Sequence, residues 1–335
     1  MFIKRIGFFL LLLNCAFFNS FAQDIHFSQV NRQPLYQNPG NTGDFKGDIR
    51  LMLNFKEQWR SVTVPFRTTV IGADFKLKKQ GINIGAFLFN DDVGDGKLRT
   101  IESLFSASKT FKITSDSSHI ITPGLAVGIN YRQIDFDKLY FDNQFNGVNF
   151  DPTLATNELL ATDNRLNLNT SLGFTHKWLR AKDEFLSSGL SFHNLNRPNQ
   201  GFFGTTVSRD IRVSLFSVYQ VPFKFDFRLK PGLGINFQGK YREFLVGSQV
   251  QYILEDRLGK YKAVDGGIWF RGRDAIIVRV GAEIQTWSVA VSYDTNVSKL
   301  VPASNLRGGI EFSVHYTIQR FKPEKVIHRI CPDYI

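Results

Sequence analysis

The chain has 335 residues, a net charge of +11 and 14% aromatic residues, including 33 Phe. Its Lys and Arg residues are scattered over turns, alternate strand positions and the tail, so no basic cluster supports a nucleic-acid partner. Anionic lipid headgroups or an acidic protein fit this charge better.

The N-terminus predicts a secretion signal. Lys4 and Arg5 precede an apolar run of about a dozen residues, and a small-residue cleavage pattern ends at Ala22. This run is shorter than the roughly 20 residues that a spanning helix needs. Cys15 lies inside the run without the small residues expected before a lipidated cysteine, so no lipid anchor is predicted. Cleavage after Ala22 would leave a net charge of +9 and only Cys331, which excludes an intrachain disulfide.

Residues 23–45 lie between the signal and the first predicted strand. They carry Pro34, Pro39 and two Asn-rich turns. Such a segment suits a periplasmic arm or a partial plug of a barrel, because its pattern is neither helical nor extended.

From residue 46 onward, apolar and polar residues alternate over about fourteen segments, which is the period of a β-strand. The last ladder is the clearest: Ile310, Phe312, Val314 and Tyr316 alternate with polar neighbours such as His315. The predicted strands are 47–59, 66–77, 81–90, 98–112, 119–132, 164–179, 185–194, 209–220, 223–237, 241–253, 260–270, 275–285, 287–295 and 306–320. Pro123 and Pro231 fall inside two of them and predict bulges or unpaired donors.

These ladders favour a transmembrane β-barrel over a soluble β-sandwich. Sandwich strands usually have about 5–6 residues, whereas crossing a bilayer takes about 9–11 tilted residues. The long ladders also keep charge off their apolar faces, where a Lys or Arg near the midplane would cost about 2–4 kcal/mol. We therefore predict an all-β, antiparallel outer-membrane barrel of about fourteen strands over residues 46–320, with both termini periplasmic.

The lengths of the connections predict the topology, because periplasmic turns are short and outer loops are long. If the first strand runs outward, the connections 78–81, 180–184 and 221–222 lie inside. The long connections then all lie outside, at residues 91–97, 133–163, 195–208 and 296–305.

The longest outer loop and its neighbour are rich in aromatic residues. Exposed aromatic residues at this density are typical of protein interfaces. An alternative is that the rings pack on one another or cap the pore. The candidate partner-binding residues are Phe136, Tyr140, Phe141, Phe145, Phe150, Phe202 and Phe203.

Residues 321–335 form a basic tail after the last strand. Solvated disorder and a docking peptide for a periplasmic partner are alternative interpretations. The candidate docking residues are Lys322, Lys325, Arg329 and Cys331, the last of which is a free thiol or half of an intermolecular bridge.

Motifs for chemistry are weak. Gly234, Gly239 and Lys240 have the spacing of a phosphate loop, but Tyr241 replaces the Ser or Thr that would hold magnesium, so a hairpin turn is predicted. Asp91, Asp92 and Asp95 lack the alternate spacing of calcium ligands. His176 lies on an apolar face near a strand end, and His315 has no evident nucleophile partner. We therefore predict no catalytic, metal or cofactor site.

A set of short motifs occurs in order along the chain. The opening carries Asp24, Ile25, His26, Phe27, Ser28 and Gln29, followed by residues 34–43, which include Pro34, Tyr36, Asn38 and Pro39. The later pieces are Gln58-Trp59-Arg60, Gly94-Asp95-Gly96, residues 135–139 and 141–144, Tyr293-Asp294 with Asn296 and Ser298, Glu311-Phe312 and Cys331-Pro332. This ordered set resembles the PorP/SprF family of Bacteroidetes outer-membrane proteins.

This resemblance implies a non-enzymatic component of the type IX secretion and gliding-motility apparatus. It implies a role in export or surface attachment of a client, such as a large adhesin with a C-terminal sorting domain. It also implies periplasmic and core type IX secretion proteins as partners. The residues themselves leave two other classes open: a passive channel or hydrophobic-substrate transporter, and a barrel-embedded hydrolase.

Overall fold

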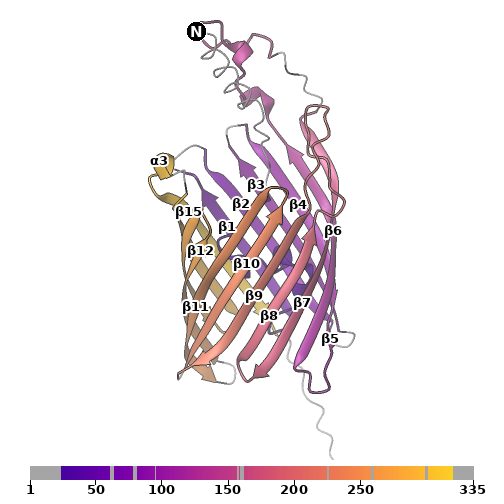
Figure 1. The fold of residues 1–335 in the computed structure, drawn as a ribbon, viewed down its shortest axis with the longest axis vertical. Helices are drawn as coiled ribbons and strands as arrows, with labels where there is room; N and C mark the ends of the chain where they lie inside the picture. Colours follow the sequence, from indigo (N-terminus) through magenta and orange to yellow (C-terminus); the bar gives the residue numbers. More distant parts are fainter. Residues whose placement is uncertain are drawn as a thin grey trace, which may run out of the picture.

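The computed structural model describes residues 24–60, 64–77, 81–94, 96–156, 158, 162–224, 226–257, 260–298 and 301–319. These residues form one antiparallel sheet that closes on itself (Figure 1), since the first strand pairs with the last. The strands are β1 (Ile49–Gln58), β2 (Phe66–Leu77), β3 (Ile82–Val93), β4 (Leu98–Lys109), β5 (Phe111–Lys112), β6 (His119–Gln133), β7 (Asn164–Ala181), β8 (Glu184–His193), β9 (Arg212–Phe223), β10 (Phe227–Gln238), β11 (Tyr241–Arg257), β12 (Lys260–Arg271), β13 (Ala275–Ile284), β14 (Trp287–Asn296) and β15 (Arg307–Ile318).

The wall has fourteen strands, because β4 and β5 are two pieces of one strand that pair along β6. The break between them is Thr110, whose N–H donates to the carbonyl of Gly81. The predicted barrel and its strand number are confirmed. The described chain also has short helices that are not part of the wall: η1 (Val30–Arg32), α2 (Pro34–Gln37), η2 (Pro39–Asn41), η3 (Phe136–Lys138), η4 (Asp142–Gln144) and α3 (Val301–Ser304). Of the helices in the described part of the chain, none is long and apolar enough to cross a membrane.

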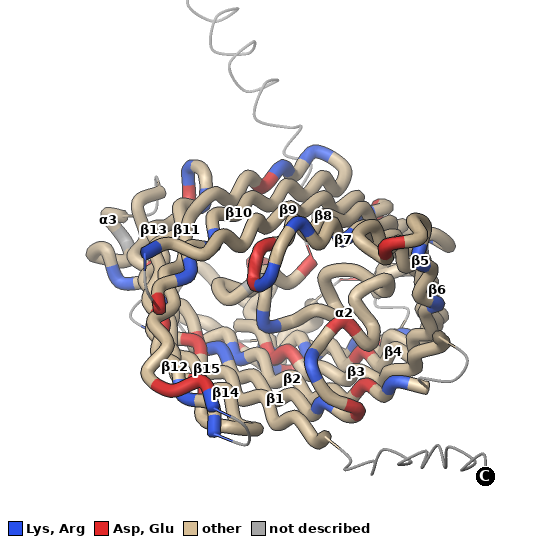
Figure 2. Tube along the Cα trace, turned by 90° about the horizontal axis from the view of Figure 1, so that it is seen from below, with Lys and Arg blue, Asp and Glu red and all other residues tan. Residues whose placement is uncertain are grey.

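Side chains alternate between the two faces of the wall as the sequence predicts. In β1, Leu51 and Leu53 are 42% and 48% exposed on the outer face, while Asn54 and Lys56 are each only 1% exposed inside. The outer face is therefore an apolar belt around a polar lumen, and Figure 2 shows charged residues within the ring as well as at its rim. Such a belt suits contact with lipid.

The two ends of the barrel differ in their connections. The long connections 134–163, 194–211 and 297–306 share one end, at the top of Figure 1, which we call the loop end. The opposite end carries short connections and is called the turn end. The predicted separation is thus observed with one correction: the connection predicted at 91–97 is short, because β3 continues to Val93 and β4 begins at Leu98. The loop end is the extracellular side on this topology.

One predicted turn was wrong. The sequence placed a turn at residues 221–222, but β9 continues to Phe223, and Lys224 and Asp226 are the turn residues that the structure describes. Pro222 remains paired with Arg228 because a proline near a strand end removes only one ladder donor. Pro231 has the predicted effect, since the pairing of β10 with β9 is interrupted between Leu229 and Gly232.

Candidate functional site

Residues 24–45 lie inside the lumen, where they form a segment that we call the plug. Asp24 lines a cavity at the loop end, whereas Asp44 and Phe45 line a second cavity at the turn end. The chain thus crosses the lumen before β1 begins at the turn end. The sequence left two arrangements open for this segment, a periplasmic arm and a partial plug. Its described part lies within the barrel, as a plug would.

Prolines shape the plug. Pro34 opens α2 and Pro39 opens η2, positions that a proline tolerates because the first N–H groups of a helix have no partner within it. Asn38 lies between the two turns and accepts a hydrogen bond from the N–H of Gly40 through its side-chain oxygen at 2.7 Å. The plug is therefore compact without a long helix.

Polar contacts join the plug to the last strand. Glu311 of β15 accepts a hydrogen bond from the N–H of Ser28 at 2.7 Å, and its other carboxylate oxygen accepts one from Asn54 of β1 at 2.7 Å. Ser28 donates its hydroxyl proton to Asp294 of β14 at 2.6 Å. Farther along, Arg32 donates to Ser313 at 3.0 Å. These contacts hold the plug against the seam where β1 meets β15.

An Asn-Pro-Gly turn of the plug rests on the opposite wall. The side-chain amide of Asn38 donates to the carbonyls of Phe174 and Leu190, both at 3.1 Å. The approach is so close that a Cβ at Gly173 would lie 2.0 Å from the side-chain oxygen of Asn38. Only glycine fits the wall at that position.

An apolar cluster inside the lumen completes the seat of the plug. Tyr36 lies with its ring edge toward Phe27, at 5.3 Å between centroids, and stacks on Phe87 at 5.7 Å. The remaining members, from the plug and from β1 to β4, are Leu35, Met52, Val70, Phe89 and Leu104. This part of the lumen departs from the polar interior of the rest of the barrel, because it is covered by the plug.

Ion pairs and hydrogen bonds fix the position of Asp24 in the plug. Arg209 donates to its carboxylate at 2.7 Å, Arg212 lies 3.6 Å away, and Asn194 and Gln238 add hydrogen bonds. Burial acts to raise the pKa of this carboxyl, but the two guanidinium groups and the hydrogen bonds outweigh it and hold the pKa well below its usual range. Asp24 is therefore ionised at all ordinary pH values.

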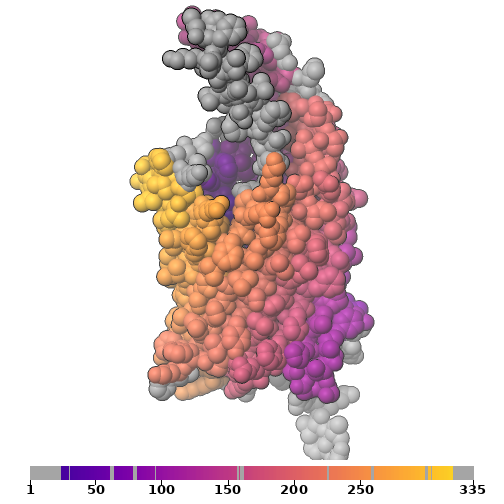
Figure 3. Space-filling view, viewed as in Figure 1, coloured from indigo at the N-terminus to yellow at the C-terminus, as the bar shows by residue number. Residues whose placement is uncertain are grey.

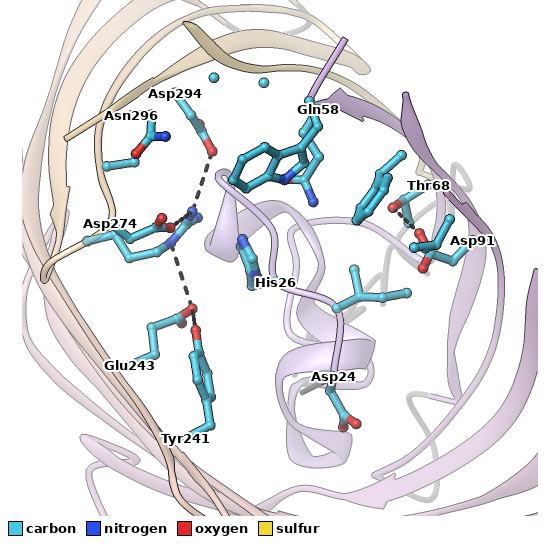
Figure 4. A pocket seen from close by; sticks show the side chains of 18 of the residues that line it. Asp24, His26, Gln58, Thr68, Asp91, Tyr241, Glu243, Asp274, Asp294 and Asn296 are labelled. Atoms are coloured by element: carbon cyan, nitrogen blue, oxygen red, sulfur yellow. Dashed lines mark hydrogen bonds and ion pairs between the residues drawn. The ribbon is translucent and has the colours of Figure 1, made fainter. Parts of the chain in front are cut away.

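Above the plug lies a cavity of about 740 Å³ that opens at the loop end, which we call the vestibule. Figure 3 shows this end hollowed beside the yellow segment around α3, with indigo early-chain residues visible inside. Figure 4 shows His26 of the plug near its centre and Glu243, Asp274 and Asp294 on one wall. Arg271 forms ion pairs with these three carboxylates. Burial, with Arg271 and Lys56 nearby, lowers the pKa of His26 well below its usual range, so this imidazole is neutral.

The family-motif residues meet at the plug and the vestibule. Trp59 lines the vestibule, and Asp294 and Glu311 are the wall residues that receive the plug. The plug itself carries Asp24, His26, Phe27, Ser28, Gln29, Pro34, Tyr36, Asn38 and Pro39. Sequence reasoning did not identify Arg209, Arg271 or Gly173, which carry no local pattern.

The outer-loop aromatics divide into two groups. Phe136 packs edge-on against Phe202 and Phe203, at 6.2 and 5.9 Å between centroids, so these rings join two loops. Phe141 is half-buried. Tyr140 and Phe150 pack on each other at 4.7 Å but stay exposed, as does Phe145. With Val148 and Leu154, these three form a surface that we call the loop patch.

The motifs judged weak have ordinary structural partners. Gly239 has φ +55° in the hairpin between β10 and β11. Asp91 accepts from Thr68, and Asp92 pairs with Arg99. Among the described residues, no group of three or more His, Cys, Asp or Glu has the arrangement of a metal site.

The two histidines considered in the sequence, His176 and His315, face different surroundings. His176 stacks on His119 at 5.3 Å between ring centroids, and His119 stacks on Trp178. A ring nitrogen of His315 is 2.9 Å from the carbonyl of Arg32 in the plug. Outside the described residues lie the predicted signal and the tail residues Lys322, Lys325, Arg329 and Cys331.

The comparisons identify relatives of this chain. A family model described as "Type IX secretion system membrane protein PorP/SprF" matches residues 19–316. No curated protein matches. Among solved structures, the Ralstonia pickettii toluene transporter TbuX has a TM-score of 0.51 at 8% identity, over 86% of this chain and 93% of its own. A Pseudomonas aeruginosa FadL homologue has a TM-score of 0.48 at 10% identity, over 84% and 93%. At these identities the likeness concerns the fold alone.

Proposed function

Since the chain belongs to the PorP/SprF family of type IX secretion system membrane proteins, we propose that it supports export and surface anchoring of a specific client protein. In this proposal the barrel is a non-enzymatic outer-membrane component that holds the client by its loop end. The client is a secreted or surface protein such as a gliding adhesin with a C-terminal sorting domain.

The observation that carries the proposal is the plug. A closed barrel whose lumen holds a segment of its own chain between two cavities is better suited to binding than to free passage of solutes. The loop patch is one such surface: Tyr140 and Val148 are each 78% exposed and Phe145 is 55% exposed. Contiguous apolar groups of this kind on an outer surface mark protein interaction sites.

Surface display of the client tests the proposal. Replacing Tyr140, Phe145 and Val148 together by Ser should reduce the amount of client on the cell surface while the barrel itself stays in the outer membrane. Asp137→Ser with Asn143→Ser, which changes exposed polar residues of the same loop, is the matched control. Unchanged display in the apolar variant would refute client binding by the loop patch.

The signal and tail have their own tests. We propose that cleavage follows Ala22, which N-terminal sequencing of the purified protein checks. We further propose that the basic tail binds periplasmic and core secretion proteins through Lys322, Lys325, Arg329 and Cys331. Truncation after Arg320 should then remove these proteins from a native-membrane pull-down, and an unchanged pull-down would contradict the proposal.

The alternative of a passive channel or hydrophobic-substrate transporter requires a path through the lumen. The plug lies between the vestibule and a turn-end cavity of about 410 Å³. Robust currents through the purified, intact barrel in planar bilayers would favour the channel over the anchoring role.

A further inference from the structure

The vestibule has two unlike walls. The wall from β1 to β4 contributes the apolar side chains of Trp59, Phe66, Phe89, Val93 and Leu98, beside the polar Gln58, Thr68, Asp91 and Thr100. The wall from β11 to β15 is charged and includes Arg271, Arg273 and Arg307 with three carboxylates. A ligand that fills the space between these walls therefore meets apolar surface on one side and charge on the other.

The charges around the vestibule do not cancel. Its lining includes Arg132, Arg242, Arg273 and Arg307, none of which makes an ion pair with the residues that the structure describes. Among the lining acids, only Asp91 likewise makes no ion pair with the described residues. Its carboxylate accepts a hydrogen bond from Thr68. The other lining acids are paired: Asp24 with Arg209, and Glu243, Asp274 and Asp294 with Arg271. Six arginines against five acids give the lining a net charge of +1, and the four arginines without an ion pair are available to an anionic ligand.

Trp59 adds an independent observation. It has φ +66°, in the left-handed region that a bulky side chain rarely adopts. Strain of this kind persists where the surrounding structure enforces it, and it clusters at functional sites. Here it places a large aromatic side chain at the mouth of the vestibule.

We propose that the vestibule binds an extended peptide segment in which carboxylates flank an aromatic or aliphatic side chain. The apolar side chain packs between Trp59, Phe66 and Phe89. The carboxylates face Arg273 and Arg307, which make charge-assisted hydrogen bonds with them. A peptide fits better than a small anion because the cavity holds about 740 Å³ and several apolar side chains line one of its walls.

This inference rests on the proposed function in one respect: it takes the segment to be part of the client protein. The vestibule and the loop patch then act as two subsites on one end of the barrel. Linked subsites raise the overall affinity because the second contact becomes intramolecular.

The test uses the intact barrel in nanodiscs of zwitterionic lipid and four fluorescent ten-residue Gly/Ser peptides. Their centres carry Asp-Phe-Asp, Asp-Ser-Asp, Lys-Phe-Lys or Ser-Phe-Ser, which separates the contributions of charge and ring. Fluorescence anisotropy should show that the Asp-Phe-Asp peptide binds most tightly, with empty nanodiscs as background. Arg273→Gln with Arg307→Gln should weaken its binding about three- to tenfold, since exposed ion pairs contribute modestly.

Two further variants separate the site from general effects. Trp59→Leu should weaken the Asp-Phe-Asp peptide but leave the Asp-Ser-Asp peptide unchanged. Arg257→Gln with Lys182→Gln makes the same change in charge at the turn end and should leave binding of the Asp-Phe-Asp peptide unchanged. Equal binding of the Lys-Phe-Lys and Asp-Phe-Asp peptides, or unchanged affinity in the double arginine variant, would overturn the proposal.

Failure here is distinguishable from failure of the proposed function. If the peptides bind as expected while client display does not depend on the barrel, the proposal that the vestibule binds a peptide is supported and the anchoring role is wrong. If display depends on the loop patch while no peptide discriminates, the anchoring role stands and the vestibule inference is wrong.

Discussion

A methyl group at Gly173 should loosen the plug. An added Cβ would lie 2.0 Å from the side-chain oxygen of Asn38 and 2.8 Å from the ring of Pro39. An ordinary contact needs at least 3.4 Å, so the Asn-Pro-Gly turn must move by about 1.4 Å away from β7. The fully buried Asn38 cannot keep its hydrogen bonds to Phe174 and Leu190 through that shift.

The size of the effect follows from these contacts. Each lost hydrogen bond that leaves a buried polar group without a partner costs about 1–3 kcal/mol. Two such losses, partly relieved by relaxation, weaken plug docking by about 2–4 kcal/mol. Since 1.4 kcal/mol is a tenfold change, the displaced plug becomes about 30-fold to several hundred-fold more populated.

Planar-bilayer recording measures this population. Gly173→Ala should show channel openings far more often than the unmodified barrel. Gly234→Ala is the matched control, because its Cβ would meet nothing closer than 3.8 Å. Ser191 lies under the plug and is 0% exposed, so a cysteine introduced there by Ser191→Cys reports on plug displacement. In barrels that carry Cys331→Ser, this cysteine should react faster with a maleimide when Gly173→Ala is present than when it is absent. Equal opening frequencies in the two alanine variants would refute the reasoning.

Three more predictions concern other parts of the molecule. Asp24→Asn leaves Arg209 with fewer partners and should destabilise plug docking by about 3–5 kcal/mol, as recorded by opening frequency. The pKa of His26 is lowered when the plug is docked, so the undocked state binds more protons below about pH 6.5. Docking should therefore weaken as the pH falls, by up to about 1.4 kcal/mol per pH unit. His26→Gln should reduce this pH dependence. Val280→Arg on the lipid face should destabilise the barrel by about 2–4 kcal/mol in vesicle unfolding experiments, whereas Val148→Arg in the outer loop should change stability by less than about 0.5 kcal/mol.

The wall was predictable because a strand has a period of two and its two faces meet different solvents. Leu51 and Leu53 face lipid while Asn54 and Lys56 face the lumen, and a shift of one residue would exchange these environments. The same reasoning placed the long connections at one end. It misplaced several strand ends. Pro222 was taken as a turn residue although it lies within β9, and the turn predicted at 180–184 is shorter because β7 runs to Ala181 and β8 begins at Glu184.

The plug was not predictable in detail because its contacts join residues that lie far apart in the chain. Ser28 meets Glu311 and Asn38 meets Leu190, and no local pattern encodes either pairing. One signal was present: Phe87 and Phe89 are apolar at lumen-facing positions of β3, where an open barrel would carry polar groups. Apolar residues on both faces of a barrel strand indicate that something covers the inner face.

The attachment of the plug to β15 bears on how the barrel is assembled. The ribosome makes Ser28 long before Glu311, yet each is the other's buried partner. The earliest segment of the chain must therefore wait for the final strand, and the ring can shut only around it. A truncated polypeptide that lacks β15 would lose the hydrogen bonds of Ser28 and Arg32 to this strand, so the plug would be fully seated only after the last strand is in place.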